Sequence, residues 1–117
     1  MEETERARTV PFGELPWTDD APGIMARETR VRGARWATVE YGPGAAREEW
    51  CEEGHRGFVI SGRIEYEFDD GGEPLRASEG EAFFLPPASL GGGAHRGRNR
   101  SGGATRLFLI DDAGGGA

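Results

Sequence analysis

The sequence contains no lysine, a single cysteine, Cys51, and only two histidines, His55 and His95. One cysteine cannot form a disulfide within the chain, which agrees with a reducing compartment. No apolar run reaches the ~18 residues of a membrane-spanning helix, and the acidic N-terminus lacks the apolar core of a secretory signal. These absences predict a cytoplasmic protein without a membrane as partner.

Positive charge is also in short supply, because the formal net charge is −7. A negative protein repels the phosphates of nucleic acids, so we expect no nucleic-acid partner. The densest basic stretch holds Arg96, Arg98 and Arg100. At strand spacing these arginines face away from His95, and we interpret them as a solvated or subunit-facing stripe.

Long helical periodicity is missing, whereas 20 glycines and 7 prolines interrupt the chain. Short segments rich in β-branched and aromatic residues alternate with turn signals, which is typical of strands. The predicted strands are residues 24–31, 34–41, 46–51, 55–62, 63–68, 74–77, 81–87, 94–100 and 104–112. So many short strands, without a credible helix, predict an all-β sandwich or barrel.

A chain of 117 residues has the size of one domain. Residues 1–22 carry two prolines among charged residues and are predicted to form an arm that Trp17 holds against the domain. The barrel is predicted over residues 23–112. The glycine-rich residues 113–117 are predicted to be a flexible tail.

The residues suited to chemistry gather in one short stretch, EEWCEEGH, which ends at His55. In a strand Glu49 and Cys51 share a face while Trp50 points the other way. The turn at residues 52–54 then brings His55 back beside them. A carboxylate, a thiol and an imidazole can therefore converge without help from the rest of the fold.

The spacing of these residues resembles the two sequence motifs of the cupin superfamily. Counting back from Gly62 puts His55 at the position of the family's glutamate, and Cys51 and Glu49 at the positions of its two histidines. The second motif is reproduced in GEAFFLPPASLGGGAHRGRN, where Gly80, Pro86, His95 and Asn99 fit it, with a longer interval between proline and histidine. The sequence looks closest to small single-domain cupins with a Trp-Cys-Glu-x-Gly-His variant of the first motif.

The resemblance implies a jelly-roll β-barrel, also described as a double-stranded β-helix, with a metal inside it. The implied ligands are Glu49, Cys51, His55 and His95. The implied cofactor is a divalent transition metal, namely Zn, Fe, Ni, Mn or Cu. Among these, a thiolate favours zinc, copper or iron over magnesium or calcium, and imidazole accommodates several transition metals. Alternatively, the two histidines and Glu49 form the arrangement of non-haem iron, with Cys51 as a bystander or fourth ligand.

Three functions remain open at this stage. The first is a metal-dependent cupin that acts on or binds a small organic molecule, and the fold alone does not choose its reaction or decide whether it is an enzyme. The second is a metal-free module that binds or senses a ligand. In the third, Cys51 acts as a nucleophile with His55 as its base, which ranks lower because neighbouring glutamates oppose thiolate formation. The resemblance also implies a homodimer.

Overall fold

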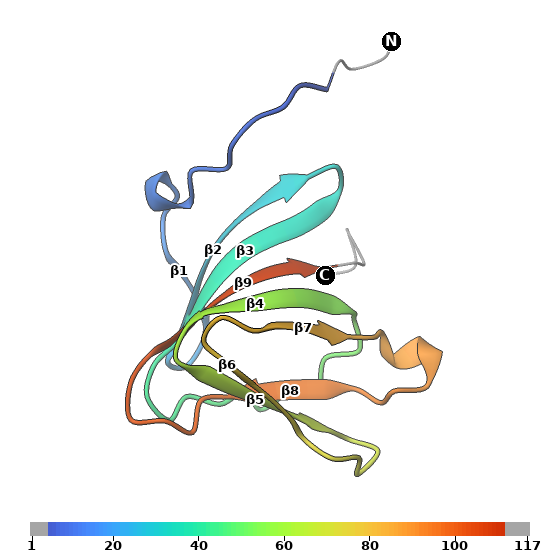
Figure 1. Cartoon of the computed structure of the whole chain (residues 1–117). Coiled ribbons are helices and arrows are strands. Elements are labelled where there is room, and N and C mark those ends of the chain that lie inside the picture. The colour runs from blue at the N-terminus through green and yellow to red at the C-terminus, as the bar shows by residue number, and fades with distance from the viewer. Residues whose placement is uncertain (1–4, 112–117) are drawn as a thin grey trace.

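The structure, a computed structural model, describes residues 5–111, in which nine strands form two antiparallel sheets (Figure 1). The strands are β1 (Thr18–Ala21), β2 (Ile24–Val31), β3 (Ala34–Tyr41), β4 (His55–Ser61), β5 (Arg63–Phe68), β6 (Leu75–Ser78), β7 (Ala82–Leu85), β8 (His95–Arg98) and β9 (Thr105–Asp111). Two single-turn 3₁₀ helices, η1 (Phe12–Glu14) and η2 (Ala88–Leu90), complete the described elements. None of the helices in the described part is long and apolar enough to cross a membrane.

The larger sheet has the strand order β1-β2-β3-β9-β4-β7, and the smaller one has the order β6-β5-β8. Figure 1 shows the larger sheet curving over the smaller one, so that the two enclose the core. The predicted all-β jelly-roll fold is therefore confirmed.

Alternation of apolar and polar side chains explains why these strands have one buried face. Leu107 and Leu109 of β9 are buried. They lie opposite Val39 and Ala37 of the paired strand β3, which are buried too. Gly57 of β4 leaves room for Phe83 of β7, because a side-chain carbon at this glycine would stand 2.3 Å from the Phe83 ring. Buried side chains from both sheets, such as Leu107 of β9 and Ile64 of β5, belong to one hydrophobic core.

The strand predicted over residues 46–51 does not form. Only Ala46 and Cys51 make isolated bridges, to Arg98 and His95 of β8 respectively. Four residues separate Ala46 from Cys51, but only two separate His95 from Arg98. The excess of two residues bulges outward, so a continuous hydrogen-bond ladder cannot form.

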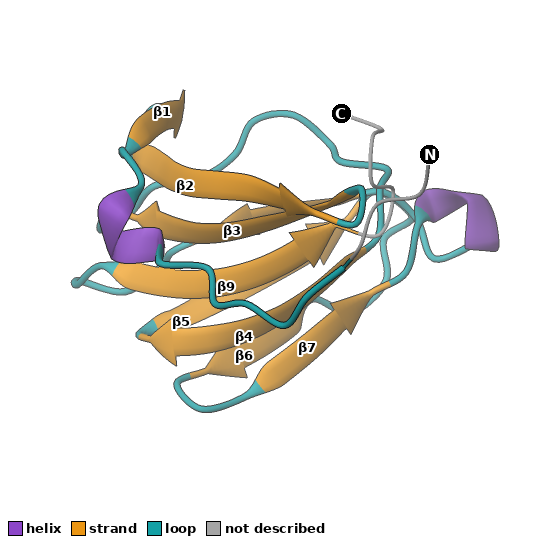
Figure 2. Ribbon diagram, turned by 90° about the horizontal axis from the view of Figure 1, so that it is seen from above, coloured by secondary structure: helices purple, strands orange, loops and turns teal. Residues whose placement is uncertain are grey.

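The predicted arm joins the sheet at its end, because β1 pairs antiparallel with β2. Trp17 lies against Arg27, whose guanidinium carbon is 4.0 Å from the ring centroid. Figure 2 shows η1 at the side of the sheet where β9 begins, and its Phe12 makes an edge contact with Phe108. The predicted tail, residues 113–117, and the first four residues of the arm lie outside the described residues.

Candidate metal centre

Three of the four predicted ligands meet inside the barrel. His55 is the first residue of β4 and His95 the first of β8, while Cys51 belongs to the connection between β3 and β4. Two backbone hydrogen bonds hold Cys51 to His95, at 2.7 and 2.9 Å. The Cys51 Sγ lies 3.4 Å from His55 Nε2, and the two imidazole centroids are 4.8 Å apart.

The donor atoms of Cys51, His55 and His95 all lie within 4.8 Å of one another. Ligands of a tetrahedral zinc ion stand about 3.5 Å apart, given metal–ligand distances of ~2.0–2.3 Å. The cluster is therefore close to the size that one transition metal requires. In addition, His95 is 2% exposed and its Nε2 has no hydrogen-bond partner in the described part of the chain. An unpartnered buried nitrogen costs about 1–3 kcal/mol, which a bound ligand would offset.

Asp111 contacts His55 on the side away from Cys51, and Arg35 contacts Asp111 in turn. Neither residue was predicted from the sequence. His55 Nδ1 lies 2.6 Å from Asp111 Oδ1 and donates a hydrogen bond to it, while Arg35 Nη1 donates to Asp111 Oδ2 at 3.1 Å. With its Nδ1 occupied, the His55 ring turns Nε2 toward Cys51. The available signal was Asp111 itself, an acid at a buried-face position after Leu107 and Leu109.

The Cys51 thiol and the His55 imidazole shift each other's ionisation. Burial alone would raise the pKa of Cys51, but the hydrogen bond with His55 and the proximity of His95 outweigh it and lower that pKa to about 6. Burial likewise opposes the charged form of His55, yet the hydrogen bonds to Asp111 and Cys51 raise its pKa to about 9. The pKa of Asp111 falls because the favourable contacts with His55 and Arg35 outweigh its burial. Near neutral pH the site holds a thiolate beside an imidazolium.

In the metal-free protein, alkylation of Cys51 by iodoacetamide is expected to follow a titration near pH 6. A lowered pKa means that the reactive thiolate dominates above that pH and is lost below it. The His55→Ala variant removes the main stabilising contact, so its alkylation midpoint should move up toward the ordinary value of 9.0. The rate is measured by mass spectrometry across a pH series. A midpoint that the substitution leaves in place would contradict this reading of the pair.

Glu49, the fourth predicted ligand, is exposed in the connection between β3 and β4. It is not part of the three-residue cluster, although it lines the same cleft. The neighbouring Trp50 points outward, where the Arg96 guanidinium carbon is 4.1 Å from its ring centroid. Glu49 therefore stands at the rim, and its role as a ligand stays a prediction.

A cleft of about 1030 Å³ opens from the cluster toward solvent. Its walls include Tyr41 and Tyr66, whose side chains are almost entirely buried. Burial raises the pKa of both phenols. Gly97 lies between them, since a side-chain carbon there would meet the Tyr41 hydroxyl and the Tyr66 ring at 2.8 Å each. The three-residue cluster is thus connected to a space that a small molecule can enter.

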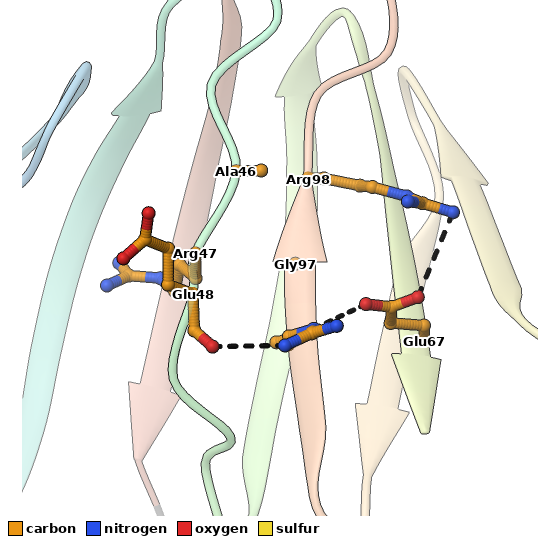
Figure 3. A pocket seen from close by; sticks show the side chains of 7 residues that line it. Ala46, Arg47, Glu48, Glu67, Gly97 and Arg98 are labelled. Carbon is orange, nitrogen blue, oxygen red and sulfur yellow. Dashed lines mark hydrogen bonds and ion pairs between the residues drawn. The ribbon is translucent and has the colours of Figure 1, made fainter. Parts of the chain in front are cut away.

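A smaller hollow of about 250 Å³ is lined by residues of β8, of β5 and of the connection between β3 and β4, five of which also line the larger cleft (Figure 3). Arg96 forms an ion pair with Glu67 and also donates to the Glu48 carbonyl oxygen at 3.0 Å. Arg98 pairs with Glu65 at 2.7 Å, as does Arg100 at 3.3 Å. The arginine stripe faces away from His95, as predicted, and its three arginines are all ion-paired with these two glutamates.

The barrel, and the position of its inward-facing histidines, define the chain as a cupin. A sequence model of the EutQ-like cupin domain matches residues 28–99, so the chain belongs to this family. The predicted membership of the cupin superfamily is thereby confirmed. No curated protein matches the chain at a significant level.

Solved structures with the same fold include KdgF from Halomonas sp., which is 23% identical, with a TM-score of 0.68 and coverage of 92% of this chain and 94% of that one. The polyketide cyclase RemF from Streptomyces resistomycificus is 17% identical, with a TM-score of 0.70 and coverage of 91% and 79%. An oxalate decarboxylase of B. subtilis is 19% identical, with a TM-score of 0.71. The match covers 95% of this chain but only 30% of the decarboxylase. Identities this low establish the fold alone.

Proposed function

We propose that the protein is a small cupin that holds a divalent transition metal on Cys51, His55 and His95 and binds or transforms a small organic molecule in the adjoining cleft. The observation that carries this proposal is the convergence of the three donor atoms within 4.8 Å. A thiolate with two imidazoles selects zinc, copper or iron by softness, while nickel and manganese remain candidates from the resemblance.

The residues of the site have separate tasks under this proposal. Cys51 offers a sulfur that ionises readily near neutral pH, because its pKa is lowered to about 6. Asp111 holds His55 in one orientation, and a bound metal would replace the Nε2 proton that the raised pKa of His55 retains. Asp111, fixed in turn by Arg35, keeps the His55 Nε2 directed at the site. Glu49 is retained as a proposed fourth donor that would have to turn inward from the rim.

A metal with an open position polarises a carbonyl or phosphoryl oxygen, or lowers the pKa of a bound water. Three protein ligands leave such a position, as in catalytic zinc sites. The cleft in front of the cluster gives a small molecule access to it. The relatives of known activity have different reactions in their names, so the reaction class stays open.

The first test is elemental analysis of protein purified without an affinity-tag metal and without chelator, followed by reconstitution with Zn²⁺ or Co²⁺. We expect about one transition-metal ion per chain. A cobalt-loaded protein should also show a thiolate-to-metal absorption band that the Cys51→Ser variant lacks, because that variant cannot supply sulfur. Absence of metal in the purified protein, together with failed reconstitution, would contradict the proposal and favour the metal-free ligand-binding module.

A nucleophilic role for Cys51 is the second candidate, supported by the hydrogen-bonded chain from Cys51 through His55 to Asp111. The same order of thiol, imidazole and carboxylate activates cysteine nucleophiles in other proteins. The lowered pKa of Cys51 also removes the objection that nearby glutamates prevent thiolate formation. Protection of Cys51 from alkylation by stoichiometric Zn²⁺ would favour the metal site over this alternative.

We also propose that the protein forms a homodimer through the outer face of β4 and β7. Phe58, Ile60 and Phe84 are 41%, 42% and 58% exposed there, and Phe58 and Phe84 lie on neighbouring strands. Association would remove this apolar surface from water. Sedimentation analysis should give a dimer for the wild type and a monomer for Phe84→Glu, whereas Leu90→Glu, at an apolar site on η2 that is 75% exposed, should leave the dimer intact. A monomeric wild type would contradict this proposal.

A further inference from the structure

The two tyrosines of the chain converge at one point of the cleft. Tyr41 ends β3 and Tyr66 lies in the middle of β5, so the larger and the smaller sheet each contribute one. Both flank Gly97 of β8, where any side chain would contact the Tyr41 hydroxyl oxygen and the Tyr66 ring. The absence of a side chain at position 97 therefore allows both tyrosines to pack directly against β8, next to each other.

The hydroxyl groups of this pair have hydrogen-bonding capacity that the protein does not use. Tyr66 is 3% exposed, and no described residue forms a hydrogen bond with its hydroxyl. The Tyr41 oxygen accepts a hydrogen bond from Arg47 Nε at 2.9 Å, and its own proton has no acceptor among the described residues. Neither hydroxyl is a fully buried atom without a partner, so the free hydrogen-bonding capacity of the pair faces water in the cleft, and an acceptor on a bound molecule can replace that water.

Arg47 adds positive charge behind Tyr41. Its Nη2 donates to Asp20 at 2.5 Å, which fixes the guanidinium in place. A phenol that accepts a hydrogen bond from a guanidinium becomes a stronger donor through its own proton. Tyr41 and Tyr66 can each direct an O–H donor into the cleft, while Arg47 behind Tyr41 is ion-paired with Asp20. O–H donors aimed at one point bind a negatively charged oxygen.

The distance from this pair to the metal ligands limits the size of the ligand. Gly97 and His95 lie two residues apart on β8, so they share a face and are separated by roughly 7 Å. The Tyr66 and His95 rings are in edge contact, with centroids 5.7 Å apart. A molecule of three or four heavy atoms in a row spans such a gap.

The rim of the cleft discriminates by charge. Seven acidic side chains line it against four arginines, Arg30, Arg35, Arg47 and Arg96, so its lining is negative on balance, and the whole chain carries a net charge of −7. Phosphate esters and dicarboxylates, with two or more negative charges, would be repelled there. A single carboxylate is repelled least among the anions, and the donor pair inside can compensate for that repulsion.

We propose that Tyr41 and Tyr66 form the recognition site for the carboxylate of a small monocarboxylic acid whose neighbouring carbon bears a carbonyl or hydroxyl oxygen. This inference rests on the proposed function, because the second oxygen is directed at the position where Cys51, His55 and His95 hold the metal. The site selects a substrate class and leaves the reaction undetermined.

The test is a titration of the zinc-loaded protein with pyruvate and with pyruvamide, its uncharged amide, followed by heteronuclear NMR. Shift changes report millimolar affinities and show at the same time that each variant is folded. The wild type should bind pyruvate more tightly than pyruvamide. Tyr66→Phe and Tyr41→Phe should each weaken pyruvate binding by about 10-fold or more, since a hydrogen bond to a charged group is lost. Neither substitution should change the zinc content.

Arginine substitutions provide a matched control. Arg47→Gln should weaken pyruvate binding, whereas Arg106→Gln, which removes an arginine from the outer face of the sheet, should have no effect. Equal affinity for pyruvate and pyruvamide, or tyrosine variants that bind like the wild type, would overturn the inference while the metal site stands. If the protein takes up no metal, the proposed function fails, and the same titration without zinc decides the inference separately by its dependence on the tyrosines.

Discussion

The His55→Ala variant is expected to lose metal uptake almost completely while it remains folded. His55 contributes one of three donor atoms, and its Nε2 also lies 3.4 Å from the Cys51 Sγ. Without it, Cys51 and His95 form a two-donor site, and the pKa of Cys51 no longer has its main lowering contact, so protons compete better for the sulfur. Asp111 keeps its ion pair with Arg35, so the substitution does not leave a buried charge without a partner.

The measurement is zinc content per chain after reconstitution and desalting, with circular dichroism to confirm the fold. Glu52→Gln is the matched control, because it changes an exposed acid of the same connection and should retain about one zinc per chain. Asp111→Asn should give a graded effect, a binding constant about 10–100-fold weaker, because it acts through the orientation of His55. Full zinc content in His55→Ala would exclude the proposed site.

The local part of the site was predictable from the sequence because few residues separate its members. Cys51 and His55 are joined by a three-residue turn, which constrains where the imidazole can lie whatever the rest of the fold does. The predicted position of Glu49 beside Cys51 depended on a continuous strand over residues 46–51. That strand does not form, because the segment has two residues more than the part of β8 that it faces. A register defect of this kind is decided by a distant partner strand, so the segment's own pattern does not contain it.

The parts of the site that were not predicted all come from long-range pairing. Asp111 and Arg35 meet His55 because β9 lies between β3 and β4 in the sheet, an order that alternation along each strand does not determine. Tyr66 lies in β5 and is buried. Its proximity to Tyr41 requires the two sheets to pack with Gly97 between them.

The second large effect is expected at Gly62, the glycine that closes the first motif. Its φ is +82°, in the left-handed region, and a side-chain carbon there would lie 2.6 Å from Thr105 Oγ1 and 2.8 Å from the Ala104 carbonyl oxygen. Thr105 is fully buried and its hydroxyl is hydrogen-bonded to the backbone of Arg63, so this neighbour has little freedom to move. Gly62→Ala should therefore combine backbone strain with a clash against β9.

Gly80 of the second motif separates the two causes. Its φ is +87°, but nothing lies within 4 Å of where its side-chain carbon would stand. Gly80→Ala should then cost only the ~1–2 kcal/mol of the left-handed backbone, whereas Gly62→Ala should cost roughly 3 kcal/mol or more, since overpacking adds ~1–3 kcal/mol. Urea unfolding of both variants in metal-free buffer measures the difference. Equal losses of unfolding free energy in the two variants would mean that backbone strain alone requires glycine at position 62. A larger loss in Gly62→Ala would mean that this glycine is also required for β4 and β5 to pack closely against β9.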